Sequence, residues 1–315
     1  MEILYGKENI IYNNFSGVGL GNFDGLHIGH MALINTLISE SSLNGLKSLV
    51  YTFNKHSENI LRKKLFTPLI TTGDKKISLL KSTPLDYLYF DEFDEKFSRM
   101  SSKQFINDIL IKKLNAKLIV AGFNYRFGYK GEGDADLLCQ YAREKKFKLI
   151  IIPPIKINNE IVSSSLIRKY IQKGNMEKVF MLLGRHYSIN GRVTTGKKIG
   201  KNLGFPTANI LPDEHIILPA KGVYVTRTLY KNKLYNSVTN IGNSPTVKND
   251  YLNCVETHLL DFENVIYNSE IEVFFLKRIR KEKQFEDKDK LIFQIKKDIR
   301  YAREFIGQNN GGFES

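Results

Sequence analysis

The pattern of apolar residues changes near residue 184, and this change limits the folds open to the chain. Before it, short strand-like apolar runs alternate with stretches in which apolar residues recur at spacings of three and four, as in Phe105, Ile109 and Leu110. Such alternation predicts a doubly wound parallel sheet with helices on both faces. The expected strands are 18–20, 48–53, 87–90, 118–121 and 149–152, with helices that begin near His30, Asp74, Ser102 and Asp134.

After residue 184, short alternating runs separated by turns replace this rhythm and predict an antiparallel β-barrel. A last helix is expected from about Asp287 to Phe305 because its apolar residues form one stripe. The total of 315 residues suits two domains, which we place at 1–183 and 184–315. The expected barrel strands are 191–193, 223–229, 234–240, 255–260 and 270–276.

A glycine-rich turn, GNFDGLHIGH at residues 21–30, follows the first expected strand and precedes a helical pattern. Its glycines allow a tight turn and close approach of a ligand. Backbone N–H groups at the start of the helix favour an anion, and two histidines at helical spacing can donate hydrogen bonds to it. The turn therefore predicts a phosphate site.

Two other interpretations of this turn are a zinc site and a purely structural turn. His27 and His30 offer only two of the three or four ligands that zinc needs, and no cysteine or third histidine lies nearby in the sequence. A purely structural turn gives two polar histidines no purpose. We therefore favour a nucleotide site.

The turn resembles the HxGH motif of nucleotidyltransferases, and FDG before HxGH resembles the adenylyltransferase half of the bifunctional riboflavin kinase/FAD synthetases. The resemblance implies a nucleotidyltransferase-like first domain in which His27 and His30 are catalytic. It also implies nucleotide contacts from the turn itself, at Gly21, Phe23, Asp24 and Gly29.

Two later segments of the first domain extend this resemblance. The loop 122–134 leaves an expected strand, and by likeness to the family Asn124 would contact ATP. Relatives often have Asp-Phe in place of Asn124 and Tyr125, and an arginine in place of Gly131, for which Lys130 is a candidate substitute. The segment 162–168 opens a helix with serines that can cap it, and the family pattern gives Ser164 and Arg168 phosphate contacts.

Two further departures from the family pattern lie in the first domain. Ser165 replaces a threonine, and Lys55-His56-Ser57 replaces Pro-His-Pro. Phe53, Tyr125 and Phe127 are candidates for stacking on a flavin, but core packing is the default for any one of them.

The second domain has its own glycine- and lysine-rich loop, which ends in Pro-Thr-Ala-Asn at residues 206–209. The loop lacks the GxxxxGK[ST] order of a Walker A motif. Its amides and lysines suit phosphates, and Thr207 with Asn209 offers two hard oxygens for Mg²⁺. It resembles the riboflavin kinase signature, although Lys201 stands where arginine is common. The nucleotide-binding residues expected here are Gly191, Gly196, Lys197, Gly200 and Lys201.

Two further segments resemble riboflavin kinases: residues 240–246, similar to NIGxxPT, and residues 256–262, which read ETHLLDF. A glutamate on an alternating strand is usually a solvent-facing residue, whereas the resemblance makes Glu256 the general base. A later departure from the family, at 265–268, places an asparagine where glycine is usual, and Asn268 can keep the turn because asparagine tolerates a positive φ.

The resemblance implies two reactions, with Mg²⁺ as cofactor and ATP as a substrate of both. Riboflavin and ATP give FMN and ADP, and FMN with a second ATP gives FAD and pyrophosphate. Two alternatives remain: a chain that retains only one activity, and a non-catalytic regulator that binds a nucleotide or RNA.

Composition bears on partners and compartment. The net charge of +14 comes from 47 lysines and arginines against 33 acidic residues, but the lysines are scattered and no aromatic RNA-binding pattern accompanies them. We interpret the charge as a solvated surface and expect no nucleic-acid partner. Cys139 and Cys254 form neither a disulfide framework nor a zinc cluster, and no apolar run has the length of a membrane span. We expect a cytoplasmic protein without a membrane partner and leave its oligomeric state open.

Overall fold

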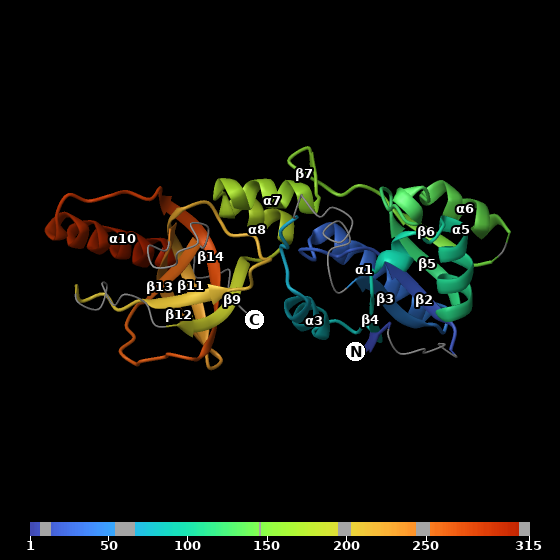
Figure 1. The fold of residues 1–315 in the computed structure, drawn as a ribbon, viewed down its shortest axis with the longest axis horizontal. Coiled ribbons are helices and arrows are strands. Elements are labelled where there is room, and N and C mark those ends of the chain that lie inside the picture. The colour runs from blue at the N-terminus through green and yellow to red at the C-terminus, as the bar shows by residue number, and fades with distance from the viewer. Residues whose placement is uncertain (7–13, 54–66, 145, 195–202, 244–252, 309–315) are drawn as a thin grey trace. The chain divides into compact units, whose positions relative to one another are not determined.

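The computed structural model describes residues 1–6, 14–53, 67–144, 146–194, 203–243 and 253–308. These residues form two compact units, Met1–Ser164 and Ser165–Ser315. Each unit has its own sheet or barrel (Figure 1).

The first unit is built on a six-stranded parallel sheet with the strand order β1-β4-β3-β2-β5-β6. This confirms the expected fold class and adds an edge strand, β1, that the sequence pattern did not indicate. The strands are β1 (Glu2–Tyr5), β2 (Ser16–Leu20), β3 (Lys47–Phe53), β4 (Tyr87–Asp91), β5 (Ala116–Gly122) and β6 (Lys148–Ile152).

Helices cover both faces of the sheet (Figure 1). One face packs against α1 (Ile28–Leu43) and α3 (Gly73–Lys81), and the other against η1 (Phe105–Lys113) and α6 (Ala135–Arg143). Short turns of helix and a small hairpin complete the unit: α4 (Glu95–Ser98), α5 (Ser102–Gln104), η2 (Tyr129–Gly131), β7 (Lys156–Ile157) and β8 (Glu160–Ile161). The helix expected from Ser102 is therefore α5 continued by η1, which is a π-helix.

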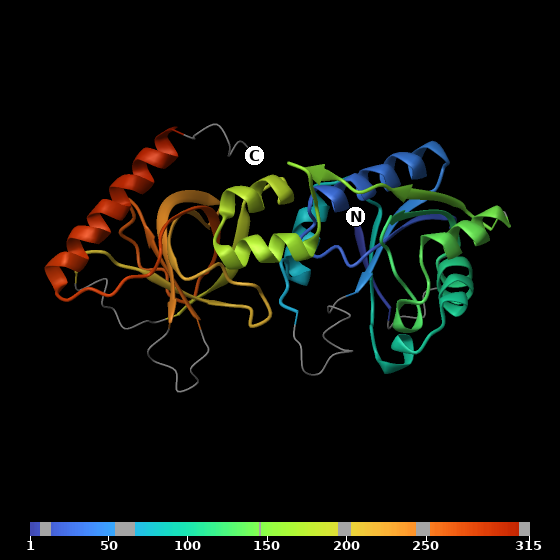
Figure 2. The ribbon, with the colours of Figure 1, turned by 90° about the horizontal axis from the view of Figure 1, so that it is seen from above.

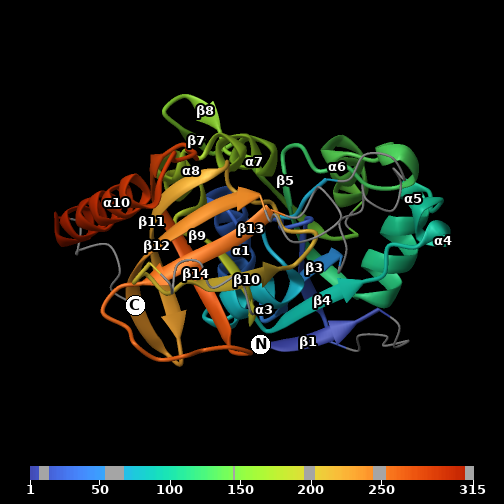
Figure 3. The same ribbon diagram turned by 60° about the vertical axis from the view of Figure 1, so that its left-hand side comes forward.

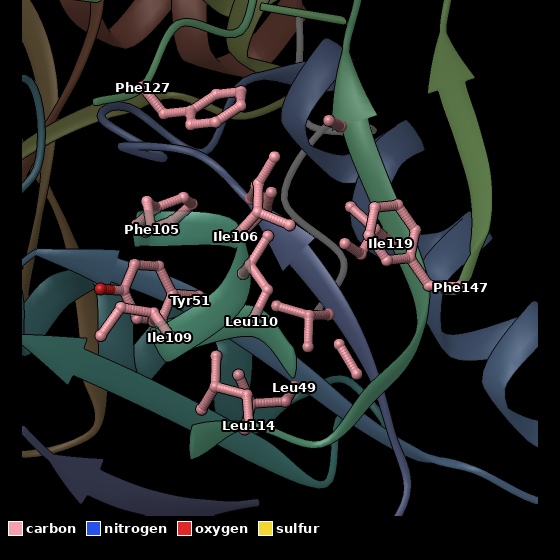
Figure 4. Packing of buried hydrophobic residues seen from close by; sticks show 14 of the residues in the cluster. Leu49, Tyr51, Phe105, Ile106, Ile109, Leu110, Leu114, Ile119, Phe127 and Phe147 are labelled. Carbon is pink, nitrogen blue, oxygen red and sulfur yellow. The ribbon is translucent and has the colours of Figure 1, made fainter. Parts of the chain in front are cut away.

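The core of this unit follows the two-residue period of its strands. On β3, Leu49 and Tyr51 join the cluster under η1, whereas Val50 joins the cluster under α1. Figure 4 shows the first cluster, in which Phe105 and Tyr51 lie near Ile106 and Ile109.

Close packing of α1 on β2 depends on small residues in the strand. A Cβ at Gly19 would lie 2.9 Å from a methyl carbon of Leu37, and one at Gly17 would lie 2.1 Å from the hydroxyl of Ser41. Because these strand residues lack side chains, α1 lies directly over β2. This contact fixes the start of α1 at the carboxyl end of β2.

The second unit is a closed antiparallel barrel with the strand order β10-β13-β12-β11-β14-β9, as expected (Figure 3). The expected last helix is α10 (Lys288–Gln308), which lies along the outside of the barrel (Figure 2). The strands are β9 (Tyr187–Thr194), β10 (Ala208–Pro212), β11 (Gly222–Tyr230), β12 (Lys233–Asn243), β13 (Asn253–Leu259) and β14 (Glu270–Arg280).

The interior of the barrel contains a cluster of buried hydroxyl groups. Thr226 shares hydrogen bonds with Ser237 at 2.8 Å and with Thr239 at 2.7 Å, and Thr239 donates to Thr257 at 2.9 Å. Val225 points the other way and packs against α10. Residues that alternate with the hydroxyl cluster therefore lie on the outer face of the barrel.

Two helices, α7 (Ser164–Lys173) and α8 (Met176–Leu183), pack with the barrel in the second unit. The amide of Ala220 donates to the carbonyl of Ile171, and Lys277 forms a 3.2 Å ion pair with Glu177. The compact units thus divide at the first residue of α7, between Ser164 and Ser165, whereas the pattern change in the sequence lies after α8. The functional boundary at 183/184 stays a prediction.

Among the described helices, none has both the length and the apolar character required to cross a membrane.

Candidate active sites

The predicted phosphate turn leaves the carboxyl end of β2, an edge where parallel sheets commonly bind ligands. Phe23 and Leu26 have φ values of 48° and 40°, in the left-handed region, and Gly25 has a φ of 86°. Such a conformation costs about 1–3 kcal/mol for each residue other than glycine. Contacts from elsewhere in the unit must therefore hold the turn in shape.

One set of contacts involves Asp24, which is 3% exposed. Its carboxylate accepts hydrogen bonds from the amides of Ile70 at 2.9 Å and Thr71 at 3.1 Å, while the Gly25 amide donates to the Thr71 hydroxyl at 2.6 Å. The hydroxyl of Ser164 donates to the Asp24 carbonyl at 2.8 Å. The Asp24 side chain is thus engaged within the protein, and its expected part in nucleotide binding stays a prediction.

A second contact comes from Lys76 on α3, which is 6% exposed. Its ammonium donates to the Asn22 carbonyl at 2.9 Å and to the Thr52 hydroxyl at 3.2 Å. Burial lowers the pKa of Lys76 to about 8, against the opposing effect of the nearby Asp24 carboxylate. Lys76 was not predicted from the sequence, although its position one helical turn before Leu80, on the buried stripe of α3, was a signal.

The two motif histidines lie together at the start of α1. His27 is the N-cap, and its Nδ1 accepts a hydrogen bond from the His30 amide at 3.1 Å. The two rings stack with centroids 3.6 Å apart and planes 11° from parallel. A Cβ at Gly29 would lie 3.2 Å from the His27 ring, so glycine leaves room for that ring.

This arrangement suits an anion. An Nδ1 that accepts a hydrogen bond leaves the proton of a neutral imidazole on Nε2, where it can be donated to a ligand. The first amides of α1 add the positive end of the helix dipole. Phe23 and Gly21 contribute shape, because the Phe23 side chain is fully buried and a Cβ at Gly21 would lie 3.1 Å from its ring.

Asn124 lies in the exposed loop after β5, the strand beside β2. Within the same loop, Tyr125 stacks on Phe127, and Phe127 packs into the core against Phe105. A flavin-stacking role for any of the three candidate aromatics stays a prediction. Ser164 is held at the turn by its hydrogen bond to Asp24, whereas Arg168 lies one turn further along α7, in the second unit.

A second site lies on the outer face of the barrel. Glu256 on β13 is the cross-strand partner of Asn209 on β10 and of Asn240 on β12. All three alternate with inward-facing residues such as Thr257, so their side chains share the outer face. The barrel thus brings a carboxylate beside two amides. The position of Asn240 opposite Glu256 was not predicted from the sequence.

Cys254 connects Glu256 with Asn209. Its thiol donates to Asn209 Oδ1 at 3.3 Å and to Glu256 Oε1 at 3.6 Å. Burial, with a further contribution from Glu256, raises the pKa of the thiol to about 12, so it stays protonated and acts as a donor. Cys254 was not predicted as part of this site. Its position two residues before Glu256, on the same face of an alternating strand, was the signal in the sequence.

Hard oxygens at this site suit a magnesium ion. Thr207 is half-buried and lies two residues before Asn209, at the entry to β10. The amide oxygen of Asn209, opposite Glu256, and the hydroxyl of Thr207, two residues earlier in the chain, are ligand types that fit an ion which keeps waters and substrate phosphates. In the part of the chain that the structure describes, no group of three or more His, Cys, Asp and Glu side chains is placed to hold a metal.

The remaining predicted residues of the second domain fall into two groups. Gly191 lies in β9 opposite Pro212, and a Cβ there would lie 2.6 Å from the Leu211 carbonyl oxygen, so strand packing already requires glycine. The other group, which lies outside the described residues, comprises Gly196, Lys197, Gly200 and Lys201. Lys55-His56-Ser57 and the end of the segment 240–246 also lie outside them. Asn268 has a φ of 62°, as expected for the turn that it was predicted to keep.

Comparison with known proteins matches both units. A family model described as FAD synthetase matches residues 12–166, and one described as riboflavin kinase matches residues 183–306. A protein of Buchnera aphidicola from Schizaphis graminum is 37% identical, over 97% of this chain and 99% of its own. Proteins of Bacillus subtilis and Escherichia coli K12 are 36% and 33% identical, over 91% and 98% of both chains, respectively. All three relatives are named bifunctional riboflavin kinase/FMN adenylyltransferase.

A solved structure from Streptococcus pneumoniae is similar over 96% of this chain and 99% of its own, with a TM-score of 0.87 and 29% identity. Its title names a macrolide-efflux protein. The likeness supports a fold that combines the parallel sheet with the barrel.

Proposed function

The chain belongs to the family of bifunctional riboflavin kinase/FMN adenylyltransferases, and we propose that each candidate site carries one of the two reactions. The protein phosphorylates riboflavin to FMN with ATP, then adenylylates FMN to FAD with a second ATP. We assign the phosphorylation to the barrel site and the adenylylation to the histidine site. The proposed functional domains are residues 1–183 and 184–315.

In the kinase reaction, Glu256 accepts the proton of the ribityl 5′-hydroxyl as its oxygen attacks the γ-phosphorus of ATP. A bond forms between that oxygen and phosphorus, the bond to the β-phosphate oxygen breaks, and ADP leaves. The thiol of Cys254 and the amide of Asn209 lie beside the carboxylate and restrict its orientation.

Magnesium is part of this proposal, with Thr207 and Asn209 as its protein ligands. When bound, the ion neutralises charge on the ATP phosphates. The phosphate contacts expected of Gly196, Lys197, Gly200 and Lys201, which lie outside the described residues, belong to the same proposal, because phosphoryl transfer depends mainly on positioning and electrostatics.

In the adenylyl transfer, the FMN phosphate is already an anion at neutral pH, so its attack on the α-phosphorus of ATP needs no base. A phosphorus–oxygen bond forms to the FMN phosphate, the bond to the β-phosphate oxygen breaks, and pyrophosphate leaves. The required stabilisation of negative charge is assigned to His27, His30, Asn124, Ser164 and Arg168.

The observation that carries the proposal is the contrast between the two sites. Glu256 lies opposite Asn209 on the barrel and accepts a hydrogen bond from Cys254, which suits a carboxylate that activates a hydroxyl. His27 and His30 lie stacked at the start of a helix, which suits an anion that needs no deprotonation.

Incubation of the protein with riboflavin, ATP and Mg²⁺, followed by chromatography of the flavins, tests this function. We expect FMN first and FAD after it. FMN alone would show that the histidine site is inactive, and FAD formed only from added FMN would show that the barrel site is inactive. Unchanged riboflavin and unchanged FMN would overturn the proposal.

A further inference from the structure

Lys76 is a charged side chain in the interior of the first unit, directly against the phosphate turn. Its ammonium donates to the carbonyl of Asn22, inside the turn, and to the hydroxyl of Thr52, at the carboxyl end of β3. Thr52 in turn donates to the same Asn22 carbonyl at 3.1 Å. A backbone carbonyl at the entry of the turn is therefore held by two donors.

A buried ammonium is an expensive means of holding a carbonyl. Burial of a charge disfavours the folded state, and a methionine of similar length would fill this position without that cost. The ammonium must therefore contribute more than packing, and what it adds is its two hydrogen bonds at the turn. Its place at the turn, among residues expected to bind ATP and FMN, points to catalysis.

The segment that contains Lys76 holds the turn at two points. Ile70 and Thr71 bind the Asp24 carboxylate, and Lys76, one turn into the helix that follows, binds the Asn22 carbonyl. Phe23 lies between Asn22 and Asp24, and Leu26 follows them. Both have left-handed backbone conformations, which persist only where neighbours fix them. The turn enters α1 at His27, the N-cap of that helix.

We propose that Lys76 is a positioning residue for adenylyl transfer, holding the Asn22 carbonyl so that the turn presents His27 and the start of α1 to the ATP phosphates. The inference rests on the function proposed above for the histidine site. It assigns Lys76 no contact with the substrates.

The protonation of Lys76 gives this role a measurable consequence. Among the described residues, the charged group that faces the ammonium is Asp24 from the turn, while β3 contributes the Thr52 hydroxyl and β4 the ring of Phe90 at 5.8 Å. Burial lowers the pKa of Lys76 to about 8, so the ammonium becomes an amine in mildly alkaline solution. Loss of the charge weakens both hydrogen bonds, because charge-assisted bonds are the stronger ones.

The test compares Lys76→Met, Lys76→Arg and, as a control, Lys81→Met, which removes an exposed lysine from the end of the same helix. We would measure kcat and KM for FAD formation from FMN, ATP and Mg²⁺ between pH 6.5 and 9.5. The expected results are a loss in kcat of roughly tenfold for Lys76→Met, with a smaller change in KM, and a wild-type rate for Lys81→Met.

The pH profile keeps the test valid if Lys76→Met does not fold. The wild-type rate should fall above about pH 8, whereas Lys76→Arg, normalised to its own rate at pH 7, should not, because arginine keeps its charge. A flat wild-type profile, the same alkaline fall in Lys76→Arg, or a folded Lys76→Met with the wild-type kcat would overturn the inference. No FAD formation by the wild-type chain would instead overturn the proposed function on which it rests.

Discussion

The imidazole rings of His27 and His30 stack at 3.6 Å between centroids, and the His30 amide donates a hydrogen bond to Nδ1 of His27. His27 thereby has two tasks. It caps α1 through Nδ1, and it leaves Nε2 as the donor that faces away from the cap. The two tasks can be separated by substitution.

We expect His27→Asn to lower FAD formation from FMN by about 100-fold while the thermal stability stays near that of the wild type, because asparagine caps helices well but lacks the second ring nitrogen. His27→Ala should lose the same activity and also about 1 kcal/mol of stability. Initial rates and thermal unfolding of both variants check this. Normal FAD formation by His27→Asn would remove the His27 ring from the proposed chemistry.

Glu256→Gln should lower kcat for FMN formation by about 100-fold or more, because glutamine keeps the shape of the side chain but cannot accept the proton. Glu263→Gln, an exposed glutamate in the turn after the same strand, is the matched control and should keep the wild-type rate. The measurement is FMN formation from riboflavin under saturating ATP and Mg²⁺. Normal turnover by Glu256→Gln would exclude it as the base.

Asn209→Ala should raise the Mg²⁺ concentration needed for half-maximal kinase activity, because it removes a proposed amide ligand of the ion. The substitution should leave the Mg²⁺ dependence of FAD formation from FMN unchanged, since His27 and His30 lie in the other unit. Titration of Mg²⁺ after removal of metal with a chelator measures both. An unchanged Mg²⁺ requirement of the kinase reaction would contradict the assignment.

Lys76 should also make stability depend on pH, with a sign opposite to its effect on activity. Its pKa is lowered from 10.5 to about 8 in the folded protein, so the unfolded chain binds more protons between these values and the stability of the wild type rises with pH there. The rise is of the order of 3 kcal/mol. Urea unfolding of wild type and Lys76→Met, compared at pH 7.5 and 10, should show this rise in the wild type only. Equal pH dependence in the two proteins would show that Lys76 does not titrate as described.

Much of the fold could be predicted from the sequence because it depends on local periodicity. Strand–helix alternation before residue 184 and short alternating runs after it predicted the parallel sheet and the barrel, which the structure confirms. The strand β10 was missed because Pro206 to Asn209 was interpreted as the end of a ligand loop, and its pairing with β13 is a contact across the sequence. Helices α7 and α8 pack with the barrel in the second unit, which the change of apolar pattern near residue 184 did not indicate.

The candidate sites were predicted where the chemistry is contiguous in the sequence, as in His27 and His30. Lys76 and Cys254 were not predicted because their roles come from partners far along the chain. The ammonium of Lys76 meets a carbonyl at Asn22, and the thiol of Cys254 meets the amide of Asn209. No local period encodes such contacts, although a lysine on an apolar helical stripe is a visible anomaly.

The central claim is that two independent sites in one chain carry the two reactions, and a reciprocal pair of variants tests it most directly. Flavins formed from riboflavin and, separately, from FMN would be measured for Glu256→Gln and His30→Ala. The account predicts that Glu256→Gln converts FMN to FAD but leaves riboflavin unchanged, and that His30→Ala converts riboflavin to FMN and stops there. Loss of both conversions in either folded variant would contradict the separation of the two sites.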